Sequence, residues 1–178
     1  MQRSTLRAAV TLAGLVSVSG FAAAQNPGGF KGEFLGNFGQ VESKFYQLVE
    51  AMPIDTYDWR PGAGVRSVCE VFMHISVDNY LMGGAFGVVM PREMEGPGAE
   101  KCPGDKAKVM AAMKASFGAI RAKVNTLTDA DMDQPAKLFG ATQTKRAWLL
   151  ATAEHAGEHL GQSIAYARSN GVVPPWSK

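Results

Sequence analysis

Four segments with a helical repeat of apolar residues, separated by stretches rich in proline and glycine, constrain the fold of this chain most strongly. In each segment apolar side chains recur every three or four residues, which is the period of one face of an α-helix. The breaks lie at residues 53–66, 90–104 and 126–141, and each contains proline, which ends helices. No window beyond residue 25 shows the sustained alternation of a strand. We therefore predict an all-α protein.

Helix-terminal signals place the ends of the four helices. Ser67 and Glu70 form the capping-box pattern at the start of the second helix, and Asp105 can cap the third. Asn170 and Gly171 are typical of a left-handed stop after the last helix. The expected helices span about residues 30–51, 67–89, 105–125 and 142–169. Four helices of this length fit a four-helix bundle formed by a single domain, residues 25–178.

The first 24 residues have the three parts of a secretory signal peptide. Residues 1–7 carry two arginines and no acid, residues 8–23 are uncharged, and residues 22–24 are all alanine. The uncharged stretch is shorter than the roughly 20 residues that span a bilayer. We expect cleavage after Ala24, export to the periplasm or the medium, and no membrane attachment of the mature protein.

The charge balance argues against a nucleic-acid partner. The chain has 18 Lys and Arg and 16 Asp and Glu residues. Because Arg3 and Arg7 lie in the predicted signal segment, the mature protein is neutral with His uncharged. A neutral chain without a basic run lacks the electrostatic footprint of a nucleic-acid binder.

The three histidines are placed as a metal site needs them. His155 and His159 are four residues apart and face the same way from the last helix, while His74 lies one to two turns into the second helix. The pair belongs to a core-facing seam of Trp148, Thr152, His155, His159, Gln162 and Tyr166. Neutral imidazole is a common ligand of divalent metals, and three protein ligands leave a position for water or substrate. The alternative is that they are ordinary core histidines.

One local motif points to a different chemistry. Residues His155, Glu158 and His159 match the H-x-x-E-H pattern of inverted zinc proteases, with Glu158 as the base. Such enzymes take a further carboxylate ligand from well downstream, and only the short segment after His159 remains. We therefore interpret Glu158 as a solvated helix charge.

Several pieces of the sequence together carry a family resemblance. They are Trp59-Arg60-Pro61 with Gly64 and Arg66-Ser67, His74 within VFMHIS, and the ending HAGEHLGQSIAYARSNGVVPPWS, from His155 to Ser177. With them the chain resembles the DinB/YfiT-like metalloenzymes, a superfamily of four-helix bundles, over nearly the whole mature length. The resemblance implies a divalent metal (zinc, nickel, iron or manganese) bound by His74, His155 and His159. It also implies hydrolase- or transferase-type chemistry on a small-molecule substrate, and it allows a homodimer.

The resemblance also implies an up-down-down-up topology with a long crossover between the second and third helices. In a simple up-down bundle the second helix, roughly 34 Å long, would separate Cys69 from Cys102. Residues 90–104 could instead run back along the bundle, because such a loop reaches about 45–50 Å. The two cysteines would then be neighbours, and we hypothesise a Cys69–Cys102 disulfide. The alternative is two unpaired thiols.

Asp78 and Gln162 are the candidate catalytic residues beside the histidines. Asp78 follows His74 by one turn and could orient an imidazole or act as a base. Gln162 continues the histidine seam and could hydrogen-bond a metal-bound ligand. Each also has a structural interpretation, as a solvated charge or as a polar group at the bundle end. We hypothesise an exported metalloenzyme, and the alternative is a non-catalytic protein that binds a metal or small ligand.

Overall fold

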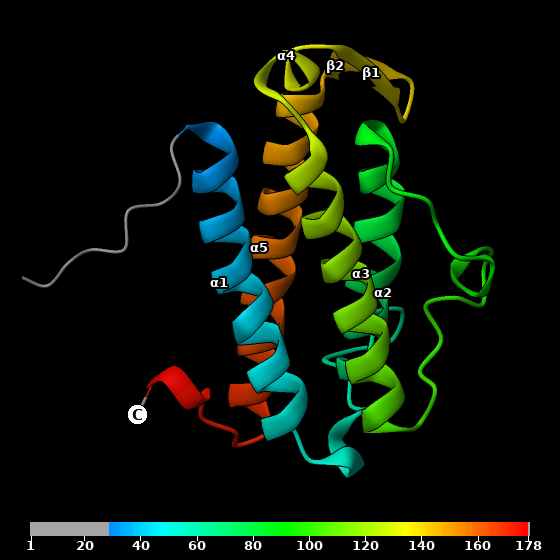
Figure 1. The fold of residues 1–178 in the computed structure, drawn as a ribbon. Coiled ribbons are helices and arrows are strands. Elements are labelled where there is room, and N and C mark those ends of the chain that lie inside the picture. The colour runs from blue at the N-terminus through cyan, green and yellow to red at the C-terminus, as the bar shows by residue number, and fades with distance from the viewer. Residues whose placement is uncertain (1–28, 178) are drawn as a thin grey trace, which may run out of the picture.

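The computed structural model describes residues 29–177, so the predicted signal peptide lies outside the described residues. The long helices of the bundle are α1 (Phe30–Ala51), α2 (Val68–Gly83), α3 (Lys106–Thr126) and α5 (Lys145–Ser169) (Figure 1). Between α3 and α5 lie the one-turn helix α4 (Asp129–Met132) and the strands β1 (Pro135–Leu138) and β2 (Ala141–Thr144). The predicted all-α four-helix bundle is confirmed. Within the described residues, no helix has both the length and the apolar character needed to cross a membrane.

The helices follow the up-down-down-up order. In Figure 1, α1 and α5 run downward while α2 and α3 both run upward, so the chain returns along the bundle between α2 and α3. The returning segment, residues 84–105, forms the crossover. Cys69 at the start of α2 and Cys102 just before α3 are joined by a disulfide, with their Cα atoms 5.4 Å apart. The hypothesised bridge is therefore present, and it ties the end of the crossover to α2.

The core is built from the apolar faces expected from the helical repeat. Aromatic rings of α1 pack on α3, with 5.0 Å between the ring centroids of Phe38 and Phe117 and 5.9 Å between those of Phe45 and Phe117. Phe45 also meets Phe72 of α2 edge-to-face. Burying a side chain of this size contributes on the order of 1.5–3 kcal/mol, so these contacts hold the helices in place.

The predicted helix caps are confirmed. The Ser67 hydroxyl accepts a hydrogen bond from the Glu70 amide at 3.2 Å, and the Glu70 carboxylate accepts one from the Ser67 amide at 2.7 Å. Asp105 accepts from the Ala107 amide at 2.8 Å at the start of α3. Because such caps satisfy amides that have no helical partner, they fix where α2 and α3 begin.

Helix α2 ends at Gly83, earlier than the predicted Val89. A Cβ atom at position 83 would lie 2.8 Å from Ile120 of α3 and from Val88, so only glycine allows this close approach. A 3₁₀ turn follows, and Gly87 then takes a φ of 93°, which starts the crossover. The predicted helix over residues 84–89 was therefore wrong, because a 3₁₀ turn and the left-handed conformation of Gly87 replace it.

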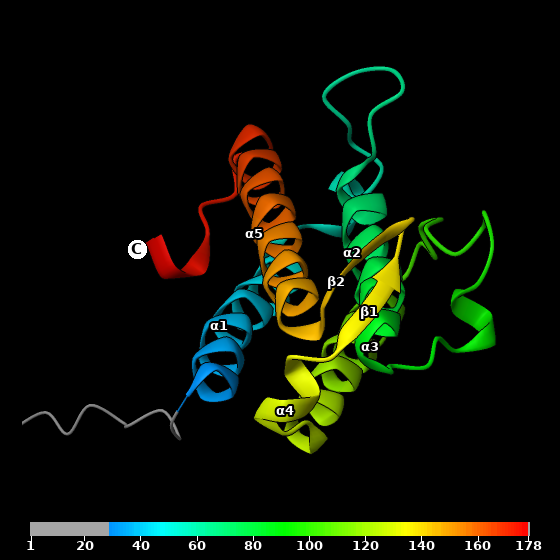
Figure 2. The same cartoon turned by 90° about the horizontal axis from the view of Figure 1, so that it is seen from above.

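The predicted loop at residues 126–141 contains structure that the sequence did not reveal. Strands β1 and β2 pair antiparallel, and the two residues between them, Phe139 and Gly140, both have positive φ, as a two-residue hairpin turn requires. Strand β2 takes residues 141–144, so α5 starts three residues later than predicted, with Thr144 as its N-cap. Four-residue strands are too short to show an alternating pattern. The hairpin covers one end of the bundle (Figure 2).

Candidate metal centre

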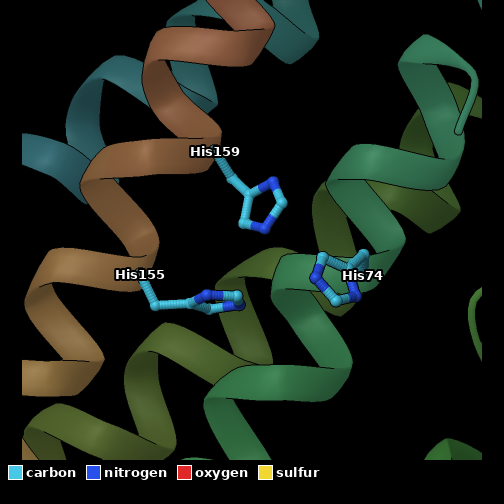
Figure 3. Close-up of side chains that lie close together, drawn as sticks. All are labelled: His74, His155 and His159. Carbon is cyan, nitrogen blue, oxygen red and sulfur yellow. The ribbon is translucent and has the colours of Figure 1, made fainter. Parts of the chain in front are cut away.

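The α5 side of the site is formed by His155 and His159. They lie one helical turn apart, and their ring centroids are 4.6 Å apart in an edge-to-face arrangement. Both rings extend from the helix toward α2 (Figure 3). The i, i+4 spacing therefore places the pair as expected, on the face of α5 that packs against the bundle.

His74 of α2 completes the cluster from the opposite side. Its ring centroid lies 5.3 Å from that of His155 and 4.6 Å from that of His159 (Figure 3). The three side chains each offer a nitrogen, and these nitrogens all lie within 4.8 Å of one another. His74 is only 8% exposed, whereas His155 and His159 are partly exposed, so the cluster is buried on its α2 side and reaches the surface on its α5 side. The structure thus brings together all three predicted ligands.

Gln162 fixes the protonation of His159. Tyr166 Oη donates to the backbone carbonyl of Arg66 at 3.3 Å, so it must accept from Gln162 Nε2, which is 2.9 Å away. The amide oxygen of Gln162 therefore faces His159 Nδ1, at 2.7 Å. Because that oxygen only accepts, Nδ1 carries the proton, and Nε2 of His159 keeps a free lone pair for a metal.

His74 has a corresponding partner in Glu100. The Glu100 Oε1 atom is 2.9 Å from His74 Nδ1, and Arg66 Nε donates to the other carboxylate oxygen, also at 2.9 Å. A carboxylate accepts, so Nδ1 of His74 carries a proton, and in the neutral ring Nε2 then has a lone pair. Carboxylate or carbonyl partners of this kind orient metal-binding histidines in many metalloproteins.

Asp78 lies between the two sides of the cluster. Its Oδ2 atom is 2.8 Å from His155 Nε2 and 3.3 Å from His74 Nε2. Its side chain is 17% exposed, so the predicted position beside the histidines is found and the interpretation as a solvated charge is not supported. His155 Nε2 is buried and, despite its distance to Asp78, has no hydrogen bond within the described structure.

The electrostatics favour a neutral His159 and an ionised Glu100. Burial lowers the pKa of His159 below its ordinary value of 6.5, and the neighbouring His155, His74 and Arg66 lower it further, against a smaller opposing effect of the Gln162 hydrogen bond. Burial raises the pKa of Glu100, but hydrogen bonds from His74 and Arg66 outweigh it, so the net pKa lies below 4.5. Near neutral pH the site therefore offers a neutral His159 and a charged Glu100, the forms that suit a metal site.

Comparison with known proteins assigns the chain to a family. The model of the DinB superfamily matches residues 37–163. This chain belongs to the DinB superfamily. No curated protein matches it.

Solved structures share the fold of this DinB-superfamily protein at low sequence identity. A DinB-like protein from Bacillus cereus is 16% identical with a TM-score of 0.72, covering 82% of this chain and 95% of its own. A DinB-like protein from Bacillus subtilis is 22% identical with a TM-score of 0.63, and the match covers 78% of this chain and 92% of that protein. YfiT from Bacillus subtilis, described as a probable metal-dependent hydrolase with an unusual four-helix bundle topology, is 18% identical with a TM-score of 0.63, covering 80% and 88%.

Glu100 and Arg66 lie at the site although the sequence predicted no role there for either. Glu100 lies in the crossover, and no local pattern links it to a histidine 26 residues earlier. The available signal was its position two residues before Cys102, because a Cys69–Cys102 bridge draws that segment toward α2. Arg66 was noted only as part of the family resemblance.

The other motif residues of the resemblance support the site indirectly. Trp59 packs edge-to-face on Tyr166, with 5.3 Å between centroids, and its carbonyl accepts from the Val68 amide at the start of α2. It therefore holds both the first turn of α2 and the tyrosine that orients Gln162. Glu158, by contrast, is 69% exposed, as expected of a solvated helix charge rather than a protease base.

A surface cavity opens beside Glu100. Its volume is about 280 Å³, and it brings three cationic side chains and two carboxylates together. The lining residues are Arg60, Gly64, Val65, Arg66, Glu70, Pro97, Glu100 and Lys101. Because Glu100 also contacts His74, the cavity lies next to the histidine cluster.

Proposed function

We propose that this protein is an exported metal-dependent enzyme that binds one divalent ion through His74, His155 and His159. The proposed reaction is of the hydrolase type on a small-molecule substrate, in keeping with what YfiT is described to be. The observation that carries the proposal is that the Nδ1 atoms of His74 and His159 each face an acceptor oxygen. Glu100 and Gln162 hold the Nδ1 protons of His74 and His159, which leaves both Nε2 lone pairs directed away from these partners.

Histidines that served only packing would have no need of this arrangement. A buried nitrogen without a hydrogen bond, such as Nε2 of His155, costs about 1–3 kcal/mol of stability. A metal ion would satisfy it together with the other two nitrogens. The donor set fits the metals expected for it, because imidazole binds zinc, nickel and iron well, and manganese accepts mixed nitrogen and oxygen ligands.

The chain's own residues would orient the site rather than supply its reactive group. A bound divalent ion supplies Lewis acidity, which polarises a substrate or acidifies a water. Gln162 acts through His159 and is a positioning residue, and Glu100 does the same for His74. His74 is buried, while His155 and His159 are partly exposed, so a small molecule could reach the cluster from the α5 side.

Export accords with the disulfide. Disulfides persist in oxidising compartments such as the periplasm and are rare in reducing ones. The Cys69–Cys102 bridge is therefore the expected state of an exported protein, and the neutral mature chain offers no footprint for nucleic acid.

Elemental analysis tests the proposal. The mature protein, purified without a metal-affinity tag, is expected to contain about one equivalent of metal, and the His155→Ala/His159→Ala variant none. Glu154→Ala is the matched control, because it changes an exposed acidic residue of the same helix that forms no hydrogen bond or ion pair with the cluster within the described residues, and it should keep the metal. Absence of metal from the wild type, even after reconstitution with zinc, nickel, iron or manganese, would contradict the proposal.

A second measurement separates an enzyme from a protein that only sequesters metal. In the cobalt-substituted protein, azide should change the visible absorption spectrum if a coordination position is open to small molecules. An unchanged spectrum at saturating azide would favour the binding protein.

A further inference from the structure

The side chain of Asp78 lies against two of the three histidines, one from each helix. It follows His74 by one turn of α2, so both side chains leave the same face of the helix. Its Oδ2 atom is close to two imidazoles from different helices, 3.3 Å from His74 Nε2 and 2.8 Å from His155 Nε2. One carboxylate oxygen is thus shared between the two sides of the cluster.

These contacts do not form an ordinary hydrogen-bonded pair. His155 Nε2 is buried and has no hydrogen bond, although Asp78 Oδ2 is within 2.8 Å, so the N–H axis of the ring is not aimed at that oxygen. His74 Nε2 has no proton to donate when Nδ1 donates to Glu100. Both nitrogens and the oxygen are better described as neighbours that face a common centre.

The separations of Asp78 Oδ2 from His74 Nε2 and from His155 Nε2 are close to those between neighbouring donors around one ion. Metal–nitrogen and metal–oxygen bonds of about 2.0–2.2 Å put neighbouring donors roughly 3.0–3.4 Å apart. We propose that Asp78 is a fourth protein ligand, so that the site has three imidazoles and one carboxylate. This inference rests on the proposed metal binding and adds to it a ligand from α2.

Charge balance supports the carboxylate as a ligand. Asp78 is 17% exposed and, among the described residues, has no cationic side chain beside it other than the histidines, whereas Glu100, 34% exposed, is already paired with Arg66. Buried charges are costly unless they are paired or bind a metal. Three neutral imidazoles add no charge to a bound divalent ion. The carboxylates of Asp78 and Glu100 would together cancel the ion's charge, which leaves only the charge of Arg66.

A fourth protein ligand restricts which metals leave room for a substrate. Zinc in proteins is mostly tetrahedral, and four protein ligands close such a site, as in structural zinc centres. Manganese, iron and nickel accept five or six ligands, and carboxylate oxygen particularly suits manganese. The three-histidine, one-carboxylate set therefore favours these metals in an active form of this protein.

Cobalt binding by matched variants tests the inference. Loss of a residue that only orients a ligand typically lowers metal affinity by about 10–100-fold. Gln162→Leu, which removes the partner of His159, is expected to fall in that range and to keep the visible spectrum of bound Co²⁺. Asp78→Ala is expected to lose more than about 100-fold and to change the spectrum, because the coordination sphere itself changes.

Asp78→Asn guards against a folding artefact, because it keeps the size of the side chain and removes its charge. Its metal-free circular dichroism and thermal unfolding should match the wild type. If Asp78→Asn binds Co²⁺ within tenfold of the wild type with the same spectrum, Asp78 is not a ligand. If the wild type itself binds no Co²⁺, the proposed metal-binding function fails along with the inference.

Discussion

The two sides of the histidine cluster are built in different ways. On the α5 side, His155, His159 and Gln162 belong to one continuous helix, and each contact spans three or four residues. On the other side, His74 depends on Glu100, which lies 26 residues away in the crossover. The α5 side therefore forms wherever the helix forms, whereas the α2 side needs the chain to return along the bundle.

The disulfide is what secures the second side. Cys69 lies five residues before His74, and Cys102 lies two residues after Glu100, so the bridge fixes the crossover next to the histidine it serves. Arg66 adds an exposed ion pair to Glu100, and exposed ion pairs contribute little, about 0–1 kcal/mol. The covalent bond is therefore the stronger constraint on Glu100.

Removing the bridge should have the largest effect on stability. The disulfide closes a loop of 33 residues in sequence separation, for which the entropy of the unfolded chain predicts about 3–4 kcal/mol. The Cys69→Ala/Cys102→Ser variant is expected to lose this amount in the free energy of unfolding, measured with urea on metal-free protein. Alanine replaces Cys69 because that position is fully buried.

Reduction of the wild type with a thiol reagent is the matched control and should reproduce the loss. A variant as stable as the oxidised wild type would mean that the crossover is held by its other contacts. The two sides of the site would then not differ in the way described.

A double-mutant cycle should expose the same difference in metal affinity. Glu100→Leu and Gln162→Leu each remove one acceptor of an imidazole N–H and should each weaken binding by about 10–100-fold, or 1.4–2.7 kcal/mol. In the variant without the disulfide, Glu100→Leu should cost less than in the wild type, because the contact is already loosened. Gln162→Leu should cost the same in both backgrounds.

Chelator competition with Ni²⁺ would give the four affinities needed for each cycle. A coupling of at least about 0.5 kcal/mol for Glu100 and none for Gln162 is the expected pattern. Equal coupling for both residues would show that the bridge supports the whole cluster rather than the crossover side alone.

The same division explains what the sequence could predict. The four helices, the caps at Ser67 and Asp105 and the seam of α5 all follow from local periodicity and hydrogen bonding. Cys69 and Cys102 could be paired only through the family topology, because their proximity depends on the path of the crossover.

The features missed from sequence are those set by tertiary contacts. Helix α2 stops at Gly83, and the chain then turns at Gly87, whose φ of 93° lies in the left-handed region. The hairpin has Phe139 rather than the usual Asn or Asp at its first turn position, so its turn signal was absent. Glu100 reaches His74 through a loop, and no sequence period describes such a contact.

Acid titration of the metal-free protein should lower its stability in two steps at different pH, one from each side of the cluster. This is the smallest of the expected effects. The lowered pKa of His159 means that the folded protein binds fewer protons there than the unfolded chain, so stability should fall as pH drops from about 6.5 through that pKa. The lowered pKa of Glu100 gives a second loss, which begins only below about pH 4.5. His159→Gln should remove the loss of stability below about pH 6.5 and keep the loss below about pH 4.5. Glu100→Gln should keep the first loss and remove the second. Urea unfolding at pH 7.5, 5.5 and 3.5 measures both, and a His159→Gln variant that keeps the full loss between pH 7.5 and 5.5 would assign that window to other groups.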